Sequence, residues 1–171
     1  SSTPMSSLSS ELESLRLNYR LPGLALIATQ DNTICDLAAV GFRKEGSSVP
    51  VTTIDKFHIG SCTKPLTATL AAILVEEGKL SWETTVSQAL PNLQSMHADF
   101  ASVTLDQLLR HKAGLSVKPP KSSWDQAWRQ IGSPMAQRAE FVASVLSEAP
   151  ELPPGSQFLY SNQSYAVAGH M

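Results

Sequence analysis

Two short motifs, about a hundred residues apart, contain residue types that could perform acyl transfer. Ser61-Cys62-Thr63-Lys64 offers a hydroxyl nucleophile and, three positions later, an amine that could activate it. Tyr160-Ser161-Asn162 offers a phenol and an amide that could face Ser61 from the opposite wall of an active site. The four histidines receive no catalytic role, because the sequence has neither a Gly-x-Ser-x-Gly elbow nor a His-Glu-x-x-His motif. The motifs therefore indicate a serine nucleophile that works with a lysine and a tyrosine.

The Ser-x-x-Lys spacing is not specific by itself, and the residues around it support a catalytic interpretation. The 23 serines and 7 lysines make roughly one such spacing expected by chance. Here Gly60 permits a tight entry into a helix, and a spacing of three places the side chains of Ser61 and Lys64 on one helix face. The first backbone amides of a helix have no partner inside it and can stabilise an oxyanion. The alternative is that Ser61 caps the helix and Lys64 is an ordinary surface residue.

The Tyr-x-Asn motif is rarer. Three tyrosines and four asparagines give an expectation of about 0.07 matches by chance. The match follows a rigid Pro153-Pro154-Gly155 loop that would deliver Tyr160 to its place. The alternative is a loop tyrosine followed by an asparagine that caps a helix. Both motifs in one chain, separated by two or three expected helices, favour a common active site.

The elements that must position these motifs begin with a helix and a hairpin. Leucines at helical spacing predict an amphipathic helix over residues 5–20, which Leu21-Pro22-Gly23 ends. Apolar runs on either side of Asp31-Asn32 predict an antiparallel hairpin over 24–42. A helix is expected over about 62–77. Its buried stripe is predicted to consist of Leu66, Leu70, Ile73 and Leu74.

The second half of the chain is predicted to be mainly helical. A capping box that starts at Thr104 opens a helix that reaches about His111, so that this histidine lies at a helix terminus. Residues 116–134 are expected to form a loop or a short helix, and residues 135–148 an amphipathic helix. A last helix is expected from Ser161 onward. The inward-facing residues of the 135–148 helix are predicted to be Phe141, Val142, Val145 and Leu146.

Composition limits the partners. A chain of 171 residues with 42% hydrophobic and 16% charged residues can form one domain with a core. Its net charge of −2 gives no reason to expect nucleic acid or an anionic membrane surface as a partner, and no apolar run has the length of a membrane span. Cys35 and Cys62 lack the spacing of metal ligands and are expected to be reduced and mostly buried. No metal and no cofactor are expected.

Several segments together resemble one family. Residues 57–68 (FHIGSCTKPLTA) resemble the nucleophile segment of the serine β-lactamase-related enzymes, which include class C β-lactamases, DD-peptidases (penicillin-binding proteins), D-aminopeptidases and esterases. Residues 21–26 resemble the first strand of that family, and 75–80 the end of its nucleophile helix. Residues 103–115 resemble its LLxHxSGL segment, and 154–165 its second catalytic motif. The likeness implies an α+β, β-lactamase/transpeptidase-like fold with a helical lobe and an antiparallel sheet.

The resemblance also implies roles for the motif residues. Ser61 would be the acylated nucleophile, Lys64 and Tyr160 would share the proton transfers, and Asn162 would hold Lys64 and the acylamide of the substrate. The expected function is a serine hydrolase that acts on an amide or ester: a β-lactam, a D-amino-acid peptide or a carboxylic ester. The alternative is a β-lactamase-like binding or sensor module with impaired turnover. The family favours a periplasmic or secreted location, and a cytoplasmic one stays open.

The chain departs from the family at the third motif, a Lys-Thr-Gly or His-x-Gly triplet on a strand after Tyr-x-Asn. Similar triplets start at Lys44, His58 and Lys112, and all of them precede the Tyr-x-Asn motif. Most of the family's sheet lies after it as well, which leaves two strands of about five. Residues 1–171 are therefore expected to form the N-terminal half of a single serine hydrolase domain. A missing C-terminal half or a second chain would pair with the free edge of strand 24–30 and complete the site.

Overall fold

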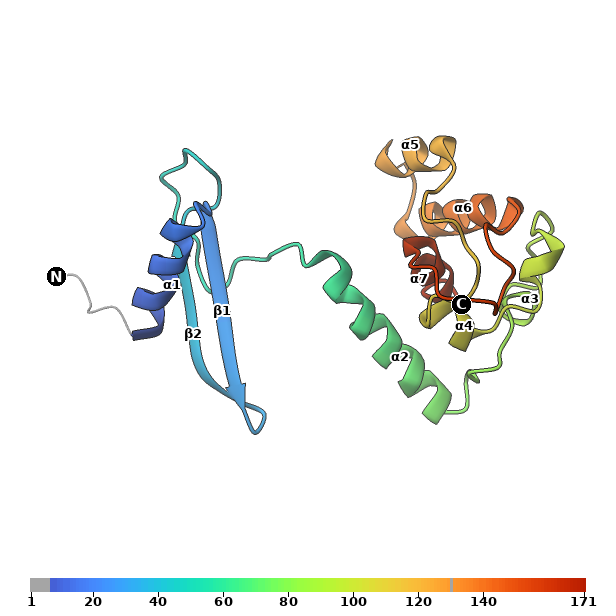
Figure 1. The fold of residues 1–171 in the computed structure, drawn as a ribbon, viewed down its shortest axis with the longest axis horizontal. Coiled ribbons are helices and arrows are strands. Elements are labelled where there is room, and N and C mark those ends of the chain that lie inside the picture. The colour runs from blue at the N-terminus through green and yellow to red at the C-terminus, as the bar shows by residue number, and fades with distance from the viewer. Residues whose placement is uncertain (1–6, 130) are drawn as a thin grey trace. The chain divides into compact units, whose positions relative to one another are not determined.

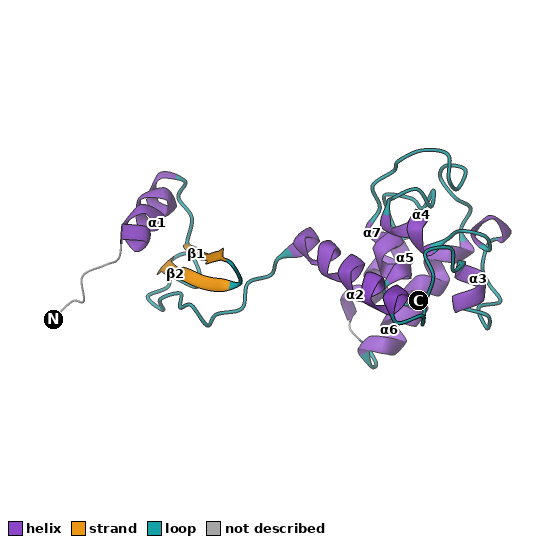
Figure 2. Cartoon of the chain, turned by 90° about the horizontal axis from the view of Figure 1, so that it is seen from below, coloured by secondary structure: helices purple, strands orange, loops and turns teal. Residues whose placement is uncertain are grey.

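A computed structural model of the protein describes residues 7–129 and 131–171. Residues 5 and 6, with which the first predicted helix begins, lie outside the described part. The chain divides into two compact units, one that ends at His58 and one that begins at Ile59. The first unit contains the two strands, and the second consists of helices and loops (Figures 1 and 2). Both motifs lie in the second unit.

The first unit is a β-hairpin with one helix. Helix α1 (Ser7–Asn18) precedes strands β1 (Gly23–Gln30) and β2 (Thr33–Gly41), which pair antiparallel along their length. Asp31 and Asn32 form the turn, with φ values of 48° and 61°. Two consecutive positive φ angles are typical of a type I′ turn, whose twist matches that of the two strands. The predicted helix and hairpin are confirmed.

Helix α1 packs on one face of the hairpin, as Figure 1 shows. The small core between them consists of Leu12, Ala38 and Val40. The opposite face exposes Ile27 (55% exposed) and Leu37 (43%), which are partners in the strand register. Within the described residues the sheet has two strands, so the other edge of β1 has no strand partner. This bare face and edge agree with the expected incomplete sheet.

Near the start of the second unit, a short 3-10 turn at the first motif runs directly into a helix of 13 residues. The elements of this unit, in chain order, are η1 (Gly60–Thr63), α2 (Lys64–Glu76), α3 (Val86–Ala89), η2 (Ala98–Phe100), α4 (Leu105–Leu109), α5 (Lys121–Arg129), α6 (Pro134–Ser147) and α7 (Asn162–Ala168). The helix predicted over 62–77 therefore starts two residues later, because the preceding residues form the tighter 3-10 turn. None of the described helices has the length and apolarity needed to cross a membrane.

The core of the second unit forms where α4, α6 and α7 meet. Its α6 residues are the predicted ones: Val142, Val145 and Leu146 are at most 5% exposed, and Phe141 packs beside them. The predicted capping box at Thr104 is also present. The Thr104 Oγ1 accepts the Gln107 N–H at 3.2 Å, and the Gln107 side chain accepts the Thr104 N–H at 3.1 Å. These local signals fix the helices on which the second motif rests.

Two expectations about burial are wrong. Of the predicted buried stripe on α2, Leu66, Leu70 and Ile73 are 62%, 57% and 45% exposed, because the main contacts of this helix in its unit are with η1 and α7 and leave the stripe uncovered. Cys35 and Cys62 are free and exposed rather than buried. Cys35 lies in the half of β2 nearest the turn, and Cys62 lies in η1, which has no buried residue.

Candidate active site

Side chains from both motifs meet at the hydroxyl oxygen of Ser61, and Asn162 joins them through Lys64. Lys64 Nζ donates to Ser61 Oγ at 3.0 Å and to Asn162 Oδ1 at 2.7 Å. The Tyr160 hydroxyl donates to the same Ser61 Oγ at 2.8 Å. The four predicted site residues, almost a hundred positions apart in sequence, are therefore brought together as one hydrogen-bonded cluster. The cluster is open to solvent, since Tyr160 is 41% exposed.

Ser61 and Lys64 are positioned by the junction of η1 and α2. Gly60 has a φ of 53°, a left-handed conformation that turns the chain sharply into the 3-10 turn. The turn is closed by the Cys62 N–H, which donates to the Ile59 carbonyl at 3.1 Å. Pro65 stands in the first turn of α2, where the missing N–H costs no helical hydrogen bond. The junction directs the serine and lysine side chains toward each other, as the spacing of three predicts.

Tyr160 and Asn162 are held by a proline-rich loop that runs beside residues 111–114. The Gly155 N–H donates to the Lys112 carbonyl at 2.7 Å, and the Leu159 N–H donates to the His111 carbonyl at 2.8 Å. Asn162 is the first residue of α7, so its backbone is anchored by a helix while its side chain reaches Lys64. Main-chain hydrogen bonds thus fix the loop immediately before the second motif.

His111 lies behind Tyr160 and is a part of the site that the sequence did not indicate. It follows α4, as the predicted helix terminus requires, but it is only 8% exposed and its Nδ1 accepts the Ser161 N–H at 3.1 Å. Its ring centroid lies 4.4 Å from that of Tyr160 and 5.2 Å from that of Tyr165. The resemblance to the LLxHxSGL segment drew attention to this residue, but no local pattern predicts that its ring faces Tyr160.

The charge of Lys64 acts on both rings. As a hydrogen-bond donor close to the phenol oxygen, Lys64 lowers the pKa of Tyr160, and the hydrogen bond with Ser61 lowers it further. Its Nζ lies 4.8 Å from the centroid of the Tyr160 ring. Burial lowers the pKa of His111, and the positive charge of Lys64 adds to this effect. The site therefore makes Tyr160 easier to ionise and favours a neutral imidazole at His111.

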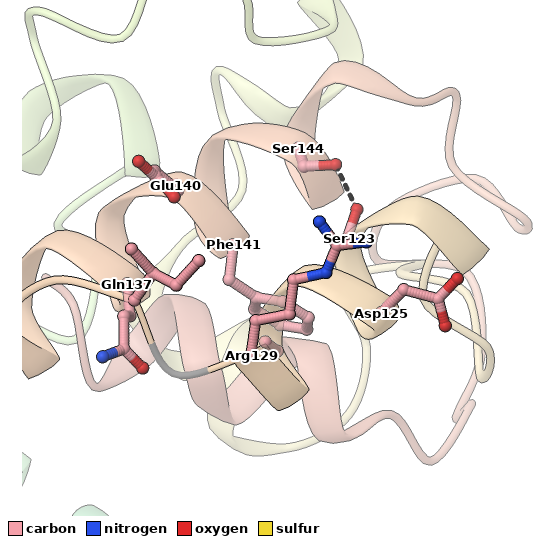
Figure 3. A pocket seen from close by; sticks show the side chains of 9 residues that line it. Ser123, Asp125, Arg129, Gln137, Glu140, Phe141 and Ser144 are labelled. Carbon is pink, nitrogen blue, oxygen red and sulfur yellow. Dashed lines mark hydrogen bonds between the residues drawn. The ribbon is translucent and has the colours of Figure 1, made fainter.

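A separate cavity of about 480 Å³ lies between α5 and α6, lined among others by Asp125, Arg129 and Phe141 (Figure 3). The hydroxyls of Ser123 and Ser144 hydrogen-bond to each other on its wall. None of the four residues of the Ser61 cluster lines it. In the described residues no group of histidine, cysteine and acidic side chains could hold a metal ion.

Comparison with known proteins identifies relatives over almost the whole chain. A family model described as Beta-lactamase matches residues 8–171. Penicillin-binding protein 4 of Amycolatopsis lactamdurans is 31% identical over 160 residues, which cover 93% of this chain and 40% of that protein. A β-lactamase of Pseudomonas fluorescens is 30% identical over 162 residues, which cover 95% of this chain and 41% of that protein. The chain thus spans about two fifths of the length of these relatives.

Solved structures show the same fold. SurE with D-Leu superimposes with a TM-score of 0.75 and 26% identity, over 96% of this chain and 34% of that chain. A class C β-lactamase in complex with cefoxitin superimposes with a TM-score of 0.71 and 24% identity, over 94% of this chain and 42% of that chain. The fold is therefore β-lactamase/transpeptidase-like, represented here by a helical lobe and two antiparallel strands. Together with the family match over residues 8–171, this places the chain in the Beta-lactamase family.

Proposed function

We propose that the protein is a serine hydrolase that cleaves an amide or ester through an acyl-enzyme on Ser61. The observation that carries the proposal is the convergence of Lys64 and Tyr160 on Ser61 Oγ, at 3.0 and 2.8 Å. A serine hydroxyl becomes a nucleophile when a base within hydrogen-bond reach accepts its proton. A serine that merely capped α2 would not require two such partners.

The lowered pKa of Tyr160 supports this residue as the group that accepts the Ser61 proton. In its ionised form, the Tyr160 oxygen accepts the Ser61 proton as Ser61 Oγ bonds to the substrate carbonyl carbon, and Lys64 stabilises the charges. The tyrosine then returns the proton to the leaving nitrogen or oxygen as the carbonyl carbon releases it. In the second half of the reaction, the Tyr160 oxygen accepts a proton from a water molecule whose oxygen attacks the acyl carbon, and it passes this proton to Ser61 Oγ as the bond between Oγ and the acyl carbon breaks.

Two further groups of the site support substrate binding. The Ser61 backbone N–H lies in the first turn of η1, where a backbone donor has no acceptor inside the helix, so it can donate to the oxyanion that forms on the substrate carbonyl. The Oδ1 of Asn162 is occupied by Lys64 at 2.7 Å, which leaves its amide N–H groups for a carbonyl of the substrate. A substrate with an acylamide next to the scissile bond fits this arrangement, as a β-lactam or a D-amino-acid peptide provides.

We further propose that residues 1–171 are the N-terminal half of one serine hydrolase domain. The bare edge of β1, the exposed face with Ile27 and Leu37, and the exposed stripe of α2 support this proposal, because such surfaces normally pack against further structure. The family's third motif would then come from the part of the domain that covers them. Activity is therefore expected of the protein at its natural length, or of this chain together with its complement.

A fluorophosphonate probe tests the proposed chemistry, because it phosphonylates an activated serine. Peptide mass mapping is expected to find the label on Ser61, and Ser61→Ala is expected to abolish both labelling and hydrolysis. Ser102→Ala, which removes an exposed serine outside the cluster, is the matched control and is expected to change neither. A protein that hydrolyses esters or β-lactams while Ser61 stays unlabelled would refute the proposal.

Kinetics of the same protein separate turnover from binding. A hydrolase gives steady product release after the first acylation. Stoichiometric acylation of Ser61 followed by no further product would instead identify the β-lactamase-like binding or sensor module.

A further inference from the structure

We propose that His111 is a positioning residue that holds Tyr160 in place for proton transfer at Ser61. The inference rests on the proposed function, because the placement of Tyr160 matters only if this residue exchanges a proton with Ser61. His111 acts through Tyr160: it hydrogen-bonds to the backbone on both sides of Tyr160 and packs against the tyrosine ring.

The backbone on either side of Tyr160 is hydrogen-bonded to the same residue. The Leu159 N–H donates to the His111 carbonyl at 2.8 Å, and the Ser161 N–H donates to the His111 Nδ1 at 3.1 Å. Ser161 is completely buried, so its N–H would lack a partner if the imidazole could not accept it. Two hydrogen bonds that bracket one residue leave its backbone little freedom to rotate.

The ring of Tyr160 is supported from behind by the imidazole. The centroid distance is 4.4 Å and the planes are inclined by 31°, so the two rings contact each other in a tilted arrangement. The imidazole is itself fixed by Tyr165, 5.2 Å away, whose hydroxyl donates to the Leu109 carbonyl at 3.0 Å, and by the edge-on ring of Phe158 at 5.6 Å. This stack sets the plane of the Tyr160 ring and thus directs its hydroxyl to Ser61 Oγ.

The arrangement requires a neutral imidazole with its proton on Nε2. Protonation of Nδ1 would place a hydrogen where the Ser161 N–H points and would break that hydrogen bond. The titratable groups that face His111 are Lys64, Tyr160 and Tyr165. Burial and the charge of Lys64 keep the pKa of His111 below its ordinary value of 6.5, so the neutral form prevails at neutral pH. The hydrogen bond between the Ser161 N–H and His111, which holds the backbone after Tyr160, is lost only as the pH falls through that lowered pKa.

The test is the rate of Ser61 phosphonylation by a fluorophosphonate probe, measured in the protein at its natural length from about pH 4.5 to about pH 8. In the wild type, the logarithm of the rate is expected to fall with a slope of about one as the Tyr160 phenolate is protonated. The slope is expected to steepen to about two below the pKa of His111, because a second protonation then impairs the site.

Two variants separate the acceptor from the ring. His111→Asn keeps an acceptor near the position of Nδ1, tolerates the φ of 56° and cannot titrate, so its profile is expected to keep a slope of about one down to the lowest pH. His111→Phe keeps a ring but leaves the Ser161 N–H unpaired, and its rate at neutral pH is expected to fall on the order of 10- to 100-fold. His97→Asn is the matched control and should match the wild type, because His97 also accepts an N–H at Nδ1, from Asp99, but lies outside the cluster.

The outcomes distinguish this inference from the proposed function. Failure of the probe to label Ser61 in the wild type would overturn the proposed function and the inference with it. If Ser61 of the wild type is labelled but the pH profile of His111→Asn also steepens to a slope of two, the role of His111 alone would be overturned. A wild-type rate in folded His111→Phe would do the same. If His111→Phe does not fold, the slopes of the wild type and His111→Asn decide.

Discussion

Replacement of Gly114 by alanine is expected to displace the loop that delivers Tyr160. Gly114 has a φ of +73°, and an added Cβ would lie closer than 3.0 Å to the carbonyl oxygen of Leu152. The Gly114 carbonyl also accepts the Glu151 N–H at 2.9 Å, so the loop cannot retreat from the new methyl group without losing hydrogen bonds. The clash therefore has to be relieved by a shift of the segment that leads to Tyr160.

The magnitude follows from two separable contributions. A left-handed backbone costs an alanine about 1 kcal/mol relative to glycine. Loss of one or two loop hydrogen bonds adds about 1 kcal/mol each, which gives about 2–3 kcal/mol in all. Gly78→Ala isolates the first contribution, because Gly78 has a φ of +71° and its Cβ would meet nothing within 4 Å. That variant is expected to lose only about 1 kcal/mol of unfolding free energy.

Equilibrium urea unfolding of the two variants and the wild type measures these differences, and fluorophosphonate labelling of Ser61 reports the position of Tyr160. Gly114→Ala is expected to be less stable than Gly78→Ala by at least about 1 kcal/mol and to be labelled more slowly. Equal stability of the two variants would refute the clash with Leu152. Greater loss in Gly114→Ala with an unchanged labelling rate would refute the link between this loop and Tyr160.

Three further predictions concern single side chains. Tyr160→Phe removes the hydroxyl that contacts Ser61 Oγ and exchanges a proton with it, so the acylation rate is expected to fall about 10²- to 10⁴-fold. The wild-type rate should decline as the pH falls through the lowered pKa of Tyr160, whereas the variant should lack this decline; an identical profile would contradict Tyr160 as the proton acceptor. Lys64→Met removes the donor to both Ser61 and Asn162, so kcat/KM in steady-state hydrolysis is expected to fall about 10²- to 10⁴-fold. A loss below tenfold would argue against Lys64 as a catalytic partner of Ser61. Thr104→Ala removes the capping hydroxyl of α4 and is expected to lower the free energy of unfolding in urea by about 1 kcal/mol, whereas Thr104→Ser should keep most of the wild-type stability. Equal losses in the two variants would show that the cap contributes little.

Local sequence patterns were sufficient for the elements whose structure depends on near neighbours. Asp31 and Asn32 specify the hairpin turn because both tolerate positive φ, and the pair of Thr104 with Gln107 specifies the start of α4. A shared site for Ser61 and Tyr160 is predicted from the two motifs taken together and from the resemblance of whole segments, because no pattern of near neighbours relates residues about a hundred positions apart. Near-neighbour patterns thus predict the elements, whereas the paired motifs and the family likeness predict the site.

Properties that depend on distant partners could not be derived in this way. The apolar periodicity of α2 predicts an inward face at Leu66 and Leu70, but periodicity does not say which structure covers that face. The surroundings of His111 depend on Leu159 and Ser161, which return to it after about fifty residues of intervening chain. A histidine after a helix looks the same in sequence whether water or a tyrosine ring lies against it.

The boundary between the two units falls three residues before the nucleophile, between His58 and Ile59. Every hydrogen bond described for the Ser61 cluster, and every loop contact that supports Tyr160, joins residues on the C-terminal side of that boundary. The hydrogen bonds of the cluster are thus contained within residues 59–171. No residue of the hairpin takes part in these hydrogen bonds, so substitutions on its surface leave the partners of Ser61 Oγ unchanged.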